Sequence, residues 1–338
     1  MLKKYNIAVI GATGAVGQVL LDLIEARNFP YNSLYLCAST RSVGKKLVVN
    51  ETEYLVEEIK EELFNNVDFV FISANNEISK NIGLLASKKN CIVIDDSSVF
   101  RMNPDVPLVV PEVNAHALKE HKGIISIPNC STTPLAMILK PLHSINPIKR
   151  VIVDTYQSVS GTGAAAIKEL NLQSSEILDN LNPTISEYPH QIAFNLIPHI
   201  DNFHENGYTN EEMKMINETR KILEIPDLPI SATCVRVPVK IAHCESVNIE
   251  LSEPIELETV NNIFSNNKGI KILDNPLKNL YPTPIEVEGK DDVLIGRIRK
   301  DLSNKNGISL WLASDNLRKG AALNAIQIAE EIISNNYF

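Results

Sequence analysis

Residues 5–17, which read YNIAVIGATGAVG, decide the fold of the first part of the chain. The apolar run Tyr5–Ile10 is typical of a buried strand, and Gln18–Ala26 after the glycines has a helical pattern. Glycines at positions 11, 14 and 17 let the backbone turn tightly, approach a pyrophosphate and present helix N–H groups to it. The spacing is G-x-x-G-x-x-G, not the commoner G-x-G-x-x-G, and a tight turn without a ligand is the alternative. We therefore expect a strand, a turn and a helix that bind a nucleotide.

The loop after the second expected strand, Ser33–Ala38, indicates which nucleotide binds. Enzymes that use NAD usually place Asp or Glu at this point to hold the ribose 2′-hydroxyl. Here residues 26–50 contain no acidic side chain, and Arg41 lies between Ser39 and Ser42. An arginine with small hydroxyl donors suits a 2′-phosphate. The loop favours NADP, with a solvated basic loop as the alternative.

Further strands follow at the spacing of an α/β fold. They are expected at residues 68–73, 91–95 and 123–127, with helices around 79–87 and 114–120. Their continuous Val and Ile content indicates strands buried on both faces, as in a parallel sheet. Ser73, Asp96 and Cys130 all follow the carboxyl ends of these strands, which is where such sheets bind ligands. The first domain is therefore expected to be a Rossmann-type NADP-binding domain.

The pattern changes after Pro141. Arg150–Gln157 alternates as a strand exposed on one face does, and Ser231–Val239 and Val247–Leu251 continue the pattern between polar connections. This predicts a second α+β catalytic and dimerisation domain on a mostly antiparallel sheet. The final helix, Ala321–Ile333, has a face of small residues that suits packing back onto the first domain. The expected boundaries are 1–132, joined by 317–338, for the cofactor domain, and 133–316 for the catalytic domain.

Composition limits the possible function classes. The 338 residues are 44% hydrophobic and 22% charged, with a net charge of −9, which argues against a general nucleic-acid surface. Five cysteines without a C-x-x-C pair suit a reduced, cytoplasmic protein better than a disulfide framework or a zinc site. No apolar stretch has the length of a membrane span or a signal-peptide core. We therefore expect neither a metal site nor a nucleic-acid or membrane partner.

A lone cysteine stands in the run Ile127-Pro128-Asn129-Cys130-Ser131-Thr132-Thr133-Pro134. The run follows a strand-like segment and precedes an apolar helical one, so the thiol is expected at the start of a helix. Backbone N–H groups and the positive end of the helix dipole favour the thiolate there. Such a thiolate can attack an aldehyde or an acyl phosphate. The alternative is an ordinary buried cysteine.

Arg236 and His243 are the other residues with a predicted chemical role. Arg236 lies within an apolar strand, where a charge is costly unless it faces a site or an ion-pair partner. His243 has an intrinsic pKa suited to proton transfer near neutrality, although a lone histidine is more often a plain polar residue. Thr209 and Glu212 form a capping box at the start of a helix, and Lys214 on that helix is expected in a solvated ladder with Glu211 and Glu218.

The chain resembles the aspartate-β-semialdehyde dehydrogenase family over essentially its whole length. Ordered matches of this number are far more specific than the glycine turn alone. Two departures are Thr133-Pro134, where the family has Ile-Gln, and Ala242-His243-Cys244, where it has Gly-His-Ser. The matching segments are Gly11–Gly17, Ala38–Lys45, Ser97–Met102, Pro128–Thr132, Tyr156–Gly161, Phe194–Pro198, Arg236–Val239, His243 and Ser314–Ala322.

The resemblance implies reversible, NADP-dependent reductive dephosphorylation of L-aspartyl-4-phosphate to aspartate 4-semialdehyde, on the route to lysine, methionine and threonine. Cys130 would carry the acyl thioester and His243 would be the acid/base. The resemblance assigns the amino-acid end of the substrate to Gln157, Arg236 and Glu211, and the phosphate to Arg101, Asn129 and Lys214. It assigns the cofactor to Thr13, Gly14, Ala15, Val16, Arg41, Ser42, Ser160, Gly161 and Asn316. The residue patterns above add Gly11, Ser39 and Ser73 to the expected cofactor site. The partners would be the small substrate, inorganic phosphate and a second copy, as a homodimer or homotetramer.

Two alternatives remain at this point. One is another phosphorylating aldehyde dehydrogenase, such as N-acetyl-glutamyl-phosphate reductase or a glyceraldehyde-phosphate type. The other is a non-catalytic NADP-binding sensor that has kept the fold. The context of Cys130 and the spacing from Arg236 to His243 favour the aspartyl enzyme.

Overall fold

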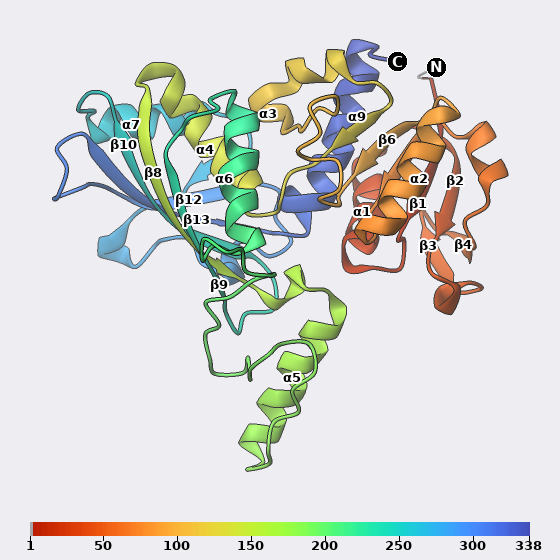
Figure 1. The fold of residues 1–338 in the computed structure, drawn as a ribbon, viewed down its shortest axis with the longest axis horizontal. Coiled ribbons are helices and arrows are strands. Elements are labelled where there is room, and N and C mark those ends of the chain that lie inside the picture. Colours follow the sequence, from red (N-terminus) through yellow and green to blue (C-terminus); the bar gives the residue numbers. More distant parts are fainter. Residues whose placement is uncertain (1–2) are drawn as a thin grey trace. The chain divides into compact units, whose positions relative to one another are not determined.

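A computed structural model describes residues 3–338 (Figure 1). The chain divides into two compact units, one running to Asn129 and including Ala321–Phe338, the other comprising Cys130–Gly320. Each unit is built around its own sheet.

The first unit contains a largely parallel sheet with the strand order β3-β4-β2-β1-β5-β6-β7. β1 is the centre of this order, so the glycine turn that follows it lies in the middle of the sheet edge. The strands are β1 (Tyr5–Ile10), β2 (Tyr31–Cys37), β3 (Lys46–Val49), β4 (Thr52–Glu57), β5 (Phe69–Ile72), β6 (Ile92–Asp95) and β7 (Ile124–Ser126).

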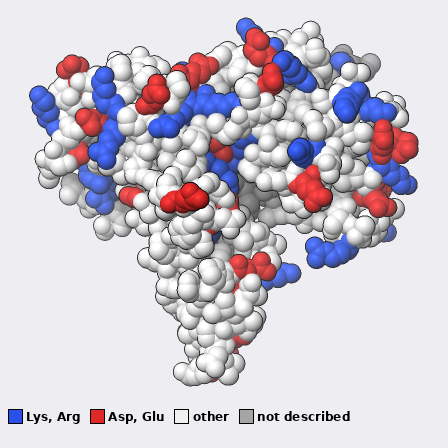
Figure 2. All heavy atoms as spheres, in the orientation of Figure 1, with Lys and Arg blue, Asp and Glu red and all other residues white. Residues whose placement is uncertain are grey.

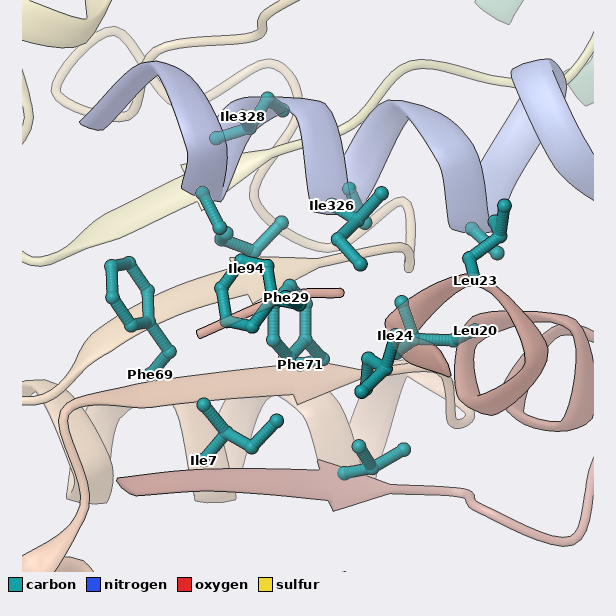
Figure 3. Packing of buried hydrophobic residues seen from close by; sticks show 14 of the residues in the cluster. Ile7, Leu20, Leu23, Ile24, Phe29, Phe69, Phe71, Ile94, Ile326 and Ile328 are labelled. Atoms are coloured by element: carbon teal, nitrogen blue, oxygen red, sulfur yellow. The ribbon is translucent and has the colours of Figure 1, made fainter. Parts of the chain in front are cut away.

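Alternate residues of these strands bury side chains on opposite faces, because successive side chains in a strand point to opposite sides. Ile7, Phe69 and Phe71 pack with α1 (Ala15–Ala26) and α9 (Leu323–Asn335), as Figure 3 shows. Ala8, Val70 and their neighbours on the other face pack with α2 (Asn76–Lys88). Both faces are covered, which explains why the strands read as continuous apolar runs.

The second unit contains a mixed sheet with the order β11-β12-β13-β10-β8-β9. Its pairs are antiparallel except β8 with β9 and β11 with β12. The strands are β8 (Ile148–Gln157), β9 (Ile230–Arg236), β10 (His243–Leu251), β11 (Ile270–Ile272), β12 (Val293–Lys300) and β13 (Gly307–Ser314).

Helices of the second unit pack on one another and on this sheet. α4 (Thr132–Ile145) contacts α6 (Asn210–Leu223), α7 (Leu257–Ser265) and β8, while α6 contacts β9. α5 (Ala164–Leu178) forms a small apolar cluster with the segment that follows it. The remaining short helices are α3 (Pro111–Asn114), in the first unit, and α8 (Pro284–Val287), in the second.

The fold class expected from the sequence is confirmed, with several local corrections. The helix expected at 114–120 is the end of α3 followed by a 3-10 turn over Ala115–Glu120. The strand expected to reach Val239 ends at Arg236, because Pro238 has no N–H with which to continue the ladder. The final helix begins with a π-helical turn over Arg318–Ala322. Strands β3, β4, β11, β12 and β13 were not predicted.

Candidate active site

Four polar side chains form one row across the second sheet. Gln157 pairs in register with Arg236 on one side and with His243 on the other, and His243 pairs with Ser314. Residues opposite each other in adjacent strands project from the same face, so Arg236, Gln157, His243 and Ser314 are neighbours on that face. All four are buried. A row of polar groups in a core is costly unless the groups have partners or a ligand.

Arg236 is held by the chain that follows β8. Its Nη1 donates to the backbone oxygen of Ser158 at 2.7 Å. Its buried Nε has no hydrogen-bond partner among the described residues. Gly161 lies directly over this part of the row, because a Cβ built on it would be 3.0 Å from Arg236 Nη1 and 3.2 Å from His243 Nε2. The guanidinium therefore keeps donors for a carboxylate, and the glycine leaves room beside it.

His243 has two very different ring nitrogens. Nδ1 accepts the backbone N–H of Ser158 at 3.0 Å, and Ser158 Oγ lies 3.1 Å from the same atom. Nε2 is buried and has no hydrogen-bond partner within residues 3–338. An Nδ1 that accepts an N–H cannot carry the proton, so the neutral ring carries it on Nε2. Burial, and then the charge of Arg236, lower the pKa of His243 to about 3. The ring is therefore a neutral donor at Nε2 near pH 7.

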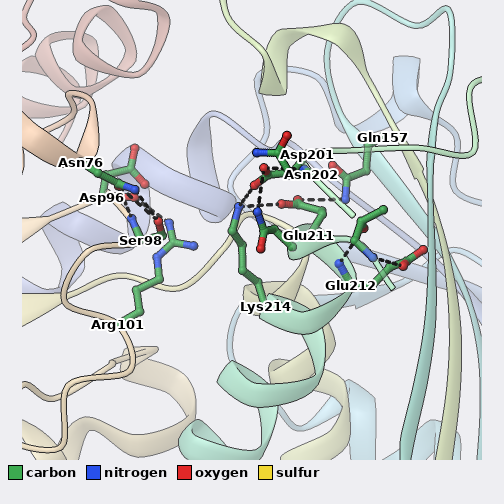
Figure 4. A network of polar contacts seen from close by, with 12 residues as sticks. Asn76, Asp96, Ser98, Arg101, Gln157, Asp201, Asn202, Glu211, Glu212 and Lys214 are labelled. Atoms are coloured by element: carbon green, nitrogen blue, oxygen red, sulfur yellow. Dashed lines mark hydrogen bonds and ion pairs between the residues drawn. The ribbon is translucent and has the colours of Figure 1, made fainter. Parts of the chain in front are cut away.

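A carboxylate and an ammonium group complete the polar network beside Gln157 (Figure 4). Gln157 Nε2 donates to Glu211 Oε1 at 3.2 Å, and Lys214 Nζ lies 3.1 Å from Glu211 Oε2 and 2.9 Å from Asp201 Oδ2. Burial by itself would lower the pKa of Lys214. The neighbouring carboxylates of Glu211 and Asp201 have the larger combined effect, so the pKa of the lysine is raised. The prediction that Glu211 pairs with Lys214 on a solvent-exposed helix face is wrong in one respect: Glu211 is buried and faces Gln157.

The capping box predicted at Thr209 is confirmed and positions this network. Thr209 Oγ1 accepts from the N–H of Glu212, whose carboxylate accepts from the N–H of Thr209. Glu212 also accepts from the backbone N–H of Cys234 in β9, at 3.1 Å. The first turn of α6 is thereby attached to the sheet, so Glu211 is held toward the row.

Cys130 lies where the chain enters α4. The helix begins at Thr132 with Ser131 as its N-cap, so the thiol is one residue before the cap rather than inside the first turn. Its side chain is half-buried and forms no disulfide. Gly320, in the π-helical turn, packs against it: a Cβ on Gly320 would be 2.9 Å from Cys130 Cβ and 3.1 Å from its Cα. Such turns are frequent at functional sites.

We expect Gly320→Ala to lower kcat by about tenfold or more while the protein still folds. Its added methyl group is closer to Cys130 than ordinary contact allows, so the cysteine must shift by a few tenths of an ångström, and catalysis is sensitive to such displacements. Steady-state kinetics measure the effect. Gly207→Ala, at an exposed loop glycine with a φ of +83° and no atom within 4 Å of the new Cβ, is the control for backbone strain without crowding. Equal kcat values for wild type and Gly320→Ala would show that the close approach has no catalytic role.

The first unit carries the glycine turn. Gly11 has a φ of +89°, and a Cβ there would be 2.0 Å from the backbone oxygen of Ser73, so only glycine fits. Gly14 is the N-cap of α1 and provides no side-chain cap, and the first turn of that helix has no acidic residue. The N–H groups at Ala15 and Val16 are thus at a helix N-terminus suited to an anion. The residues fit the pyrophosphate of a dinucleotide.

The loop after β2 is next to this turn. Thr13 Oγ1 donates to Ser42 Oγ at 3.3 Å, so the buried Ser42 and the glycine turn belong to one site. Ser39 and Arg41 are exposed in the same loop, around a 3-10 turn over Thr40–Ser42. The exposed guanidinium is available to a phosphate.

Arg101 lies beside two carboxyl groups at the end of β6 (Figure 4). Its Nη2 donates to the backbone oxygen of Asp96 at 2.6 Å. Burial raises the pKa of Asp96 to about 7 even though the charge of Arg101 opposes this. Ser73 Oγ donates to Asp96 Oδ2 at 3.2 Å, which connects the ends of β5 and β6. Asn129, the last residue of the first unit before Cys130, is also buried.

The structure brings the predicted residues together in two groups. In the second unit, Ser160, Gly161 and Asn316 lie with His243, although the resemblance assigns them to the cofactor. Asn316 Oδ1 accepts from Ser160 Oγ, from Ser158 Oγ and from the N–H of Ala242. Sequence reasoning missed Ser158 and Gly320 as parts of the site. Only their position in matching segments could have indicated them.

Basic and acidic side chains are interspersed on the face shown in Figure 2. Among residues 3–338, no group of three or more His, Cys, Asp or Glu side chains is arranged to hold a metal ion. Within the same range, no helix combines the length and apolar character needed to cross a bilayer.

Comparisons with known proteins identify relatives over nearly the whole chain. Residues 6–121 match a family model described as the NAD binding domain of semialdehyde dehydrogenase, and residues 139–319 match the dimerisation domain of semialdehyde dehydrogenase. The chain is 48% identical to the aspartate-semialdehyde dehydrogenase of Prochlorococcus marinus, covering 99% of this chain and 97% of the relative. It is 47% identical to the Bacillus subtilis enzyme of the same name, covering 98% of each.

Solved structures are similar over the same length. Aspartate semialdehyde dehydrogenase II from Vibrio cholerae, also solved in complex with ASA, has a TM-score of 0.96 and 43% identity, covering 99% of this chain and 100% of that one. The enzyme from Candida albicans, solved with NADP, has a TM-score of 0.78 and 26% identity, covering 99% and 100%.

Proposed function

Because this chain belongs to the aspartate-semialdehyde dehydrogenase family, we propose that it performs that reaction through a thioester on Cys130. The chain is an oxidoreductase of amino-acid biosynthesis that acts on aspartate semialdehyde with a nicotinamide cofactor. The finer assignments below are ours. The observation that supports them most is the row of Arg236, Gln157 and His243, in the same unit as a cysteine at the entrance to α4.

In the reductive direction the Cys130 thiolate attacks the acyl carbon of L-aspartyl-4-phosphate. The S–C bond forms, the C–O bond to phosphate breaks, and inorganic phosphate leaves with its electron pair. The bound nicotinamide supplies the hydride that reduces the thioester, or accepts it in the reverse direction. When the S–C bond breaks, the sulfur leaves as the thiolate and the 4-semialdehyde is released.

His243 is proposed to act at the substrate oxygen. Each tetrahedral species places negative charge on the former carbonyl oxygen, and a buried, neutral Nε2–H donor stabilises that charge without first losing a proton. The N–H stays on the ring, because a neutral imidazole that gave up this proton would become an imidazolate, so His243 acts by hydrogen-bonding the hemithioacetal oxygen while the sulfur leaves as the thiolate. The resemblance assigns His243 the acid/base role, and we propose that it performs this role as a hydrogen-bond donor.

Substrate recognition is assigned to the charged groups of the row. Arg236, with its Nη1 fixed on the Ser158 carbonyl, would bind the α-carboxylate through its remaining N–H groups. Gln157 would orient the same end of the substrate, and Glu211, which already holds Gln157 and Lys214, would attract the α-ammonium. Arg101, Asn129 and Lys214 are the proposed phosphate ligands, each on the basis of the resemblance.

We propose NADP as the cofactor. It would be held by the glycine turn and by the loop after β2, where an arginine stands and an acidic residue is absent from positions 26–50. Ser160, Gly161 and Asn316 are further proposed cofactor contacts, on the basis of the resemblance.

Arg41→Ala is expected to raise the KM for NADP⁺ by about tenfold to a hundredfold and to leave the KM for NAD⁺ nearly unchanged. The reason is loss of one charge-assisted contact to the 2′-phosphate, which contributes about 1.5–3 kcal/mol. Lys45→Ala removes a positive charge from the same exposed loop and is the control. Equal effects of the two changes would mean that the loop attracts phosphate only through its net charge.

Assembly and location are also proposals. The second unit carries exposed apolar side chains around and after α5, at Leu178, Leu181, Phe194, Leu196 and Phe203. Together with the match to a dimerisation domain, they support a homodimer, or a tetramer built from dimers. The five cysteines are all thiols, which supports a reducing compartment such as the cytoplasm.

The direct test is a substrate panel in the oxidative direction. Aspartate semialdehyde should give NADPH only when inorganic phosphate is present, and the N-acetylated glutamate analogue should be turned over at least about a hundredfold less efficiently, because Glu211 has no ammonium to bind. Preference for the acetylated analogue, or turnover that does not depend on phosphate, would contradict the proposal.

A further inference from the structure

Asn316 is the common acceptor of the segments around His243. It lies two residues after the end of β13 and is buried. Its Oδ1 accepts from the N–H of Ala242 at 2.9 Å, from Ser160 Oγ at 3.0 Å and from Ser158 Oγ at 3.2 Å. A backbone N–H can only donate, so the amide orientation is fixed by this contact and the oxygen must face Ala242. The amide nitrogen therefore points away from these donors.

Two of the three donors act directly on the histidine. Ala242 precedes His243 and has a φ of +77°, in the left-handed region that an alanine rarely adopts. Its N–H bond to Asn316 holds the backbone in that conformation at the start of β10. Ser158 is the residue whose N–H and hydroxyl both lie within 3.1 Å of His243 Nδ1. The side-chain oxygen of Asn316 thus positions His243 in two ways. It holds the backbone of the preceding residue, Ala242, and it holds Ser158, which contacts the ring.

We propose that Asn316 is a positioning residue for His243: its side-chain oxygen holds Ala242 and Ser158 so that Nδ1 of the ring accepts and Nε2 donates. This inference rests on the proposed role of His243 at the substrate oxygen. It goes beyond cofactor contact, because the oxygen of Asn316 acts on the protein and only its nitrogen is left for a cofactor. A single side chain would then connect cofactor binding with the protonation state of the catalytic ring.

The segment that carries Asn316 is itself firmly anchored. Asp315 accepts from the N–H groups of Gly289, at 2.8 Å, and of Leu317, at 2.9 Å. Arg318 forms an ion pair with Asp291 at 2.6 Å. Gly320, two residues further on, packs against Cys130. The same short segment therefore braces both proposed reacting residues.

The charged groups around the ring of His243 do not take over this positioning role of Asn316. Arg236 on β9 and Glu211 on α6 act on His243 with opposite signs, and Glu245 on β10 is buried. Burial raises the pKa of Glu245 well above its ordinary value, which favours the uncharged form of this carboxyl group. Nδ1 accepts the backbone N–H of Ser158, while the single hydroxyl proton of Ser158 goes to Asn316 Oδ1. The choice of protonated nitrogen thus depends on Ser158, which Asn316 holds.

The test uses cofactor-free enzyme labelled with ¹⁵N in its histidines, with the His243 signals assigned by their loss in His243→Asn. In the wild type, Nε2 should carry the proton from pH 5 to pH 9. Asn316→Leu, which is similar in size but has no acceptor, should give exchange-averaged signals in which both nitrogens are partly protonated. Asn316→Asp keeps an acceptor for all three donors and should preserve the wild-type tautomer. Asn261→Asp, the same chemical change on the exposed face of α7, is the control.

Steady-state kinetics provide the second measurement. We expect kcat to fall about tenfold or more in Asn316→Leu. Asn316→Asp is judged by its ring signals alone, because Asn316 is also a proposed cofactor contact. Wild-type ring signals in Asn316→Leu, with a loss confined to the KM for NADP⁺, would overturn the inference and leave Asn316 a cofactor contact only. If the leucine variant does not fold, Asn316→Ala is read by the same two criteria. The ring signals need neither turnover nor Cys130, so failure of this inference is distinguishable from failure of the proposed reaction.

Discussion

Replacing Cys130 with alanine should lower kcat for phosphate-dependent oxidation of aspartate semialdehyde by at least about a thousandfold. Without the sulfur, no covalent bond to the substrate can form, and the remaining groups can only bind and orient the aldehyde. The side chain is half-buried at the entrance to α4, so removing it leaves a small change in packing rather than a large cavity. Formation of NADPH, followed spectrophotometrically, measures the loss.

The matched control is Cys91→Ala. This thiol is buried in the core of the first unit, where its Sγ lies 3.3 Å from the backbone oxygen of Phe64. Its removal should lower thermal stability modestly and leave kcat within about twofold. The reason is that a buried thiol that takes no part in the reaction contributes to the stability of the core and not to catalysis. If Cys130→Ala kept near-normal turnover, the thioester mechanism would have to be abandoned.

The second large effect is expected for His243→Asn, with kcat falling about a hundredfold to ten-thousandfold. The substrate oxygen then loses the Nε2–H donor, whereas Arg236 and Gln157 remain to bind the amino-acid end. The KM for aspartate semialdehyde should therefore change much less than kcat. His190→Asn, which alters an exposed histidine of the same unit, is the control.

The lowered pKa of His243 leads to a prediction for the pH dependence of kcat in the wild type. Its folded-state pKa of about 3 lies below the ordinary value of 6.5, so the ring is neutral in the folded protein throughout the range from pH 5 to pH 9. The plot of kcat against pH should therefore show no rise or fall near pH 6.5 that is due to titration of His243. A limb near that pH in the wild type that vanishes in His243→Asn would show that the ring is charged during turnover, contrary to the assignment made here.

Local patterns were sufficient to predict most of the parallel strands of the nucleotide-binding half, although β3 and β4 were missed. The apolar run before Gly11 and the glycine turn are confirmed as β1 and the start of α1, because only a tight turn without side chains passes so close to Ser73. The helix after Cys130 is likewise confirmed, with the correction that the thiol precedes the N-cap. Each of these features depends on neighbours in the sequence.

The arrangement of the catalytic row could not be predicted in this way. Whether His243 lies beside Gln157 depends on the register between β8 and β10, which are separated by more than eighty residues. The position of Asn316 depends on β13, a strand that the sequence reading missed, and on the turn that follows it. Register and strand order are set by packing across the whole sheet, so one sequence does not specify them locally.

The central claim is that Cys130 holds the substrate covalently during the reaction. It is tested most directly by mass spectrometry of enzyme mixed with an acylating substrate, quenched in acid and digested. The account predicts an acyl adduct on the peptide that contains Cys130, absent from Cys130→Ala and lost when the quenched sample is treated with a strong nucleophile. Full turnover with no adduct on that peptide, or with the adduct on another cysteine, would contradict it.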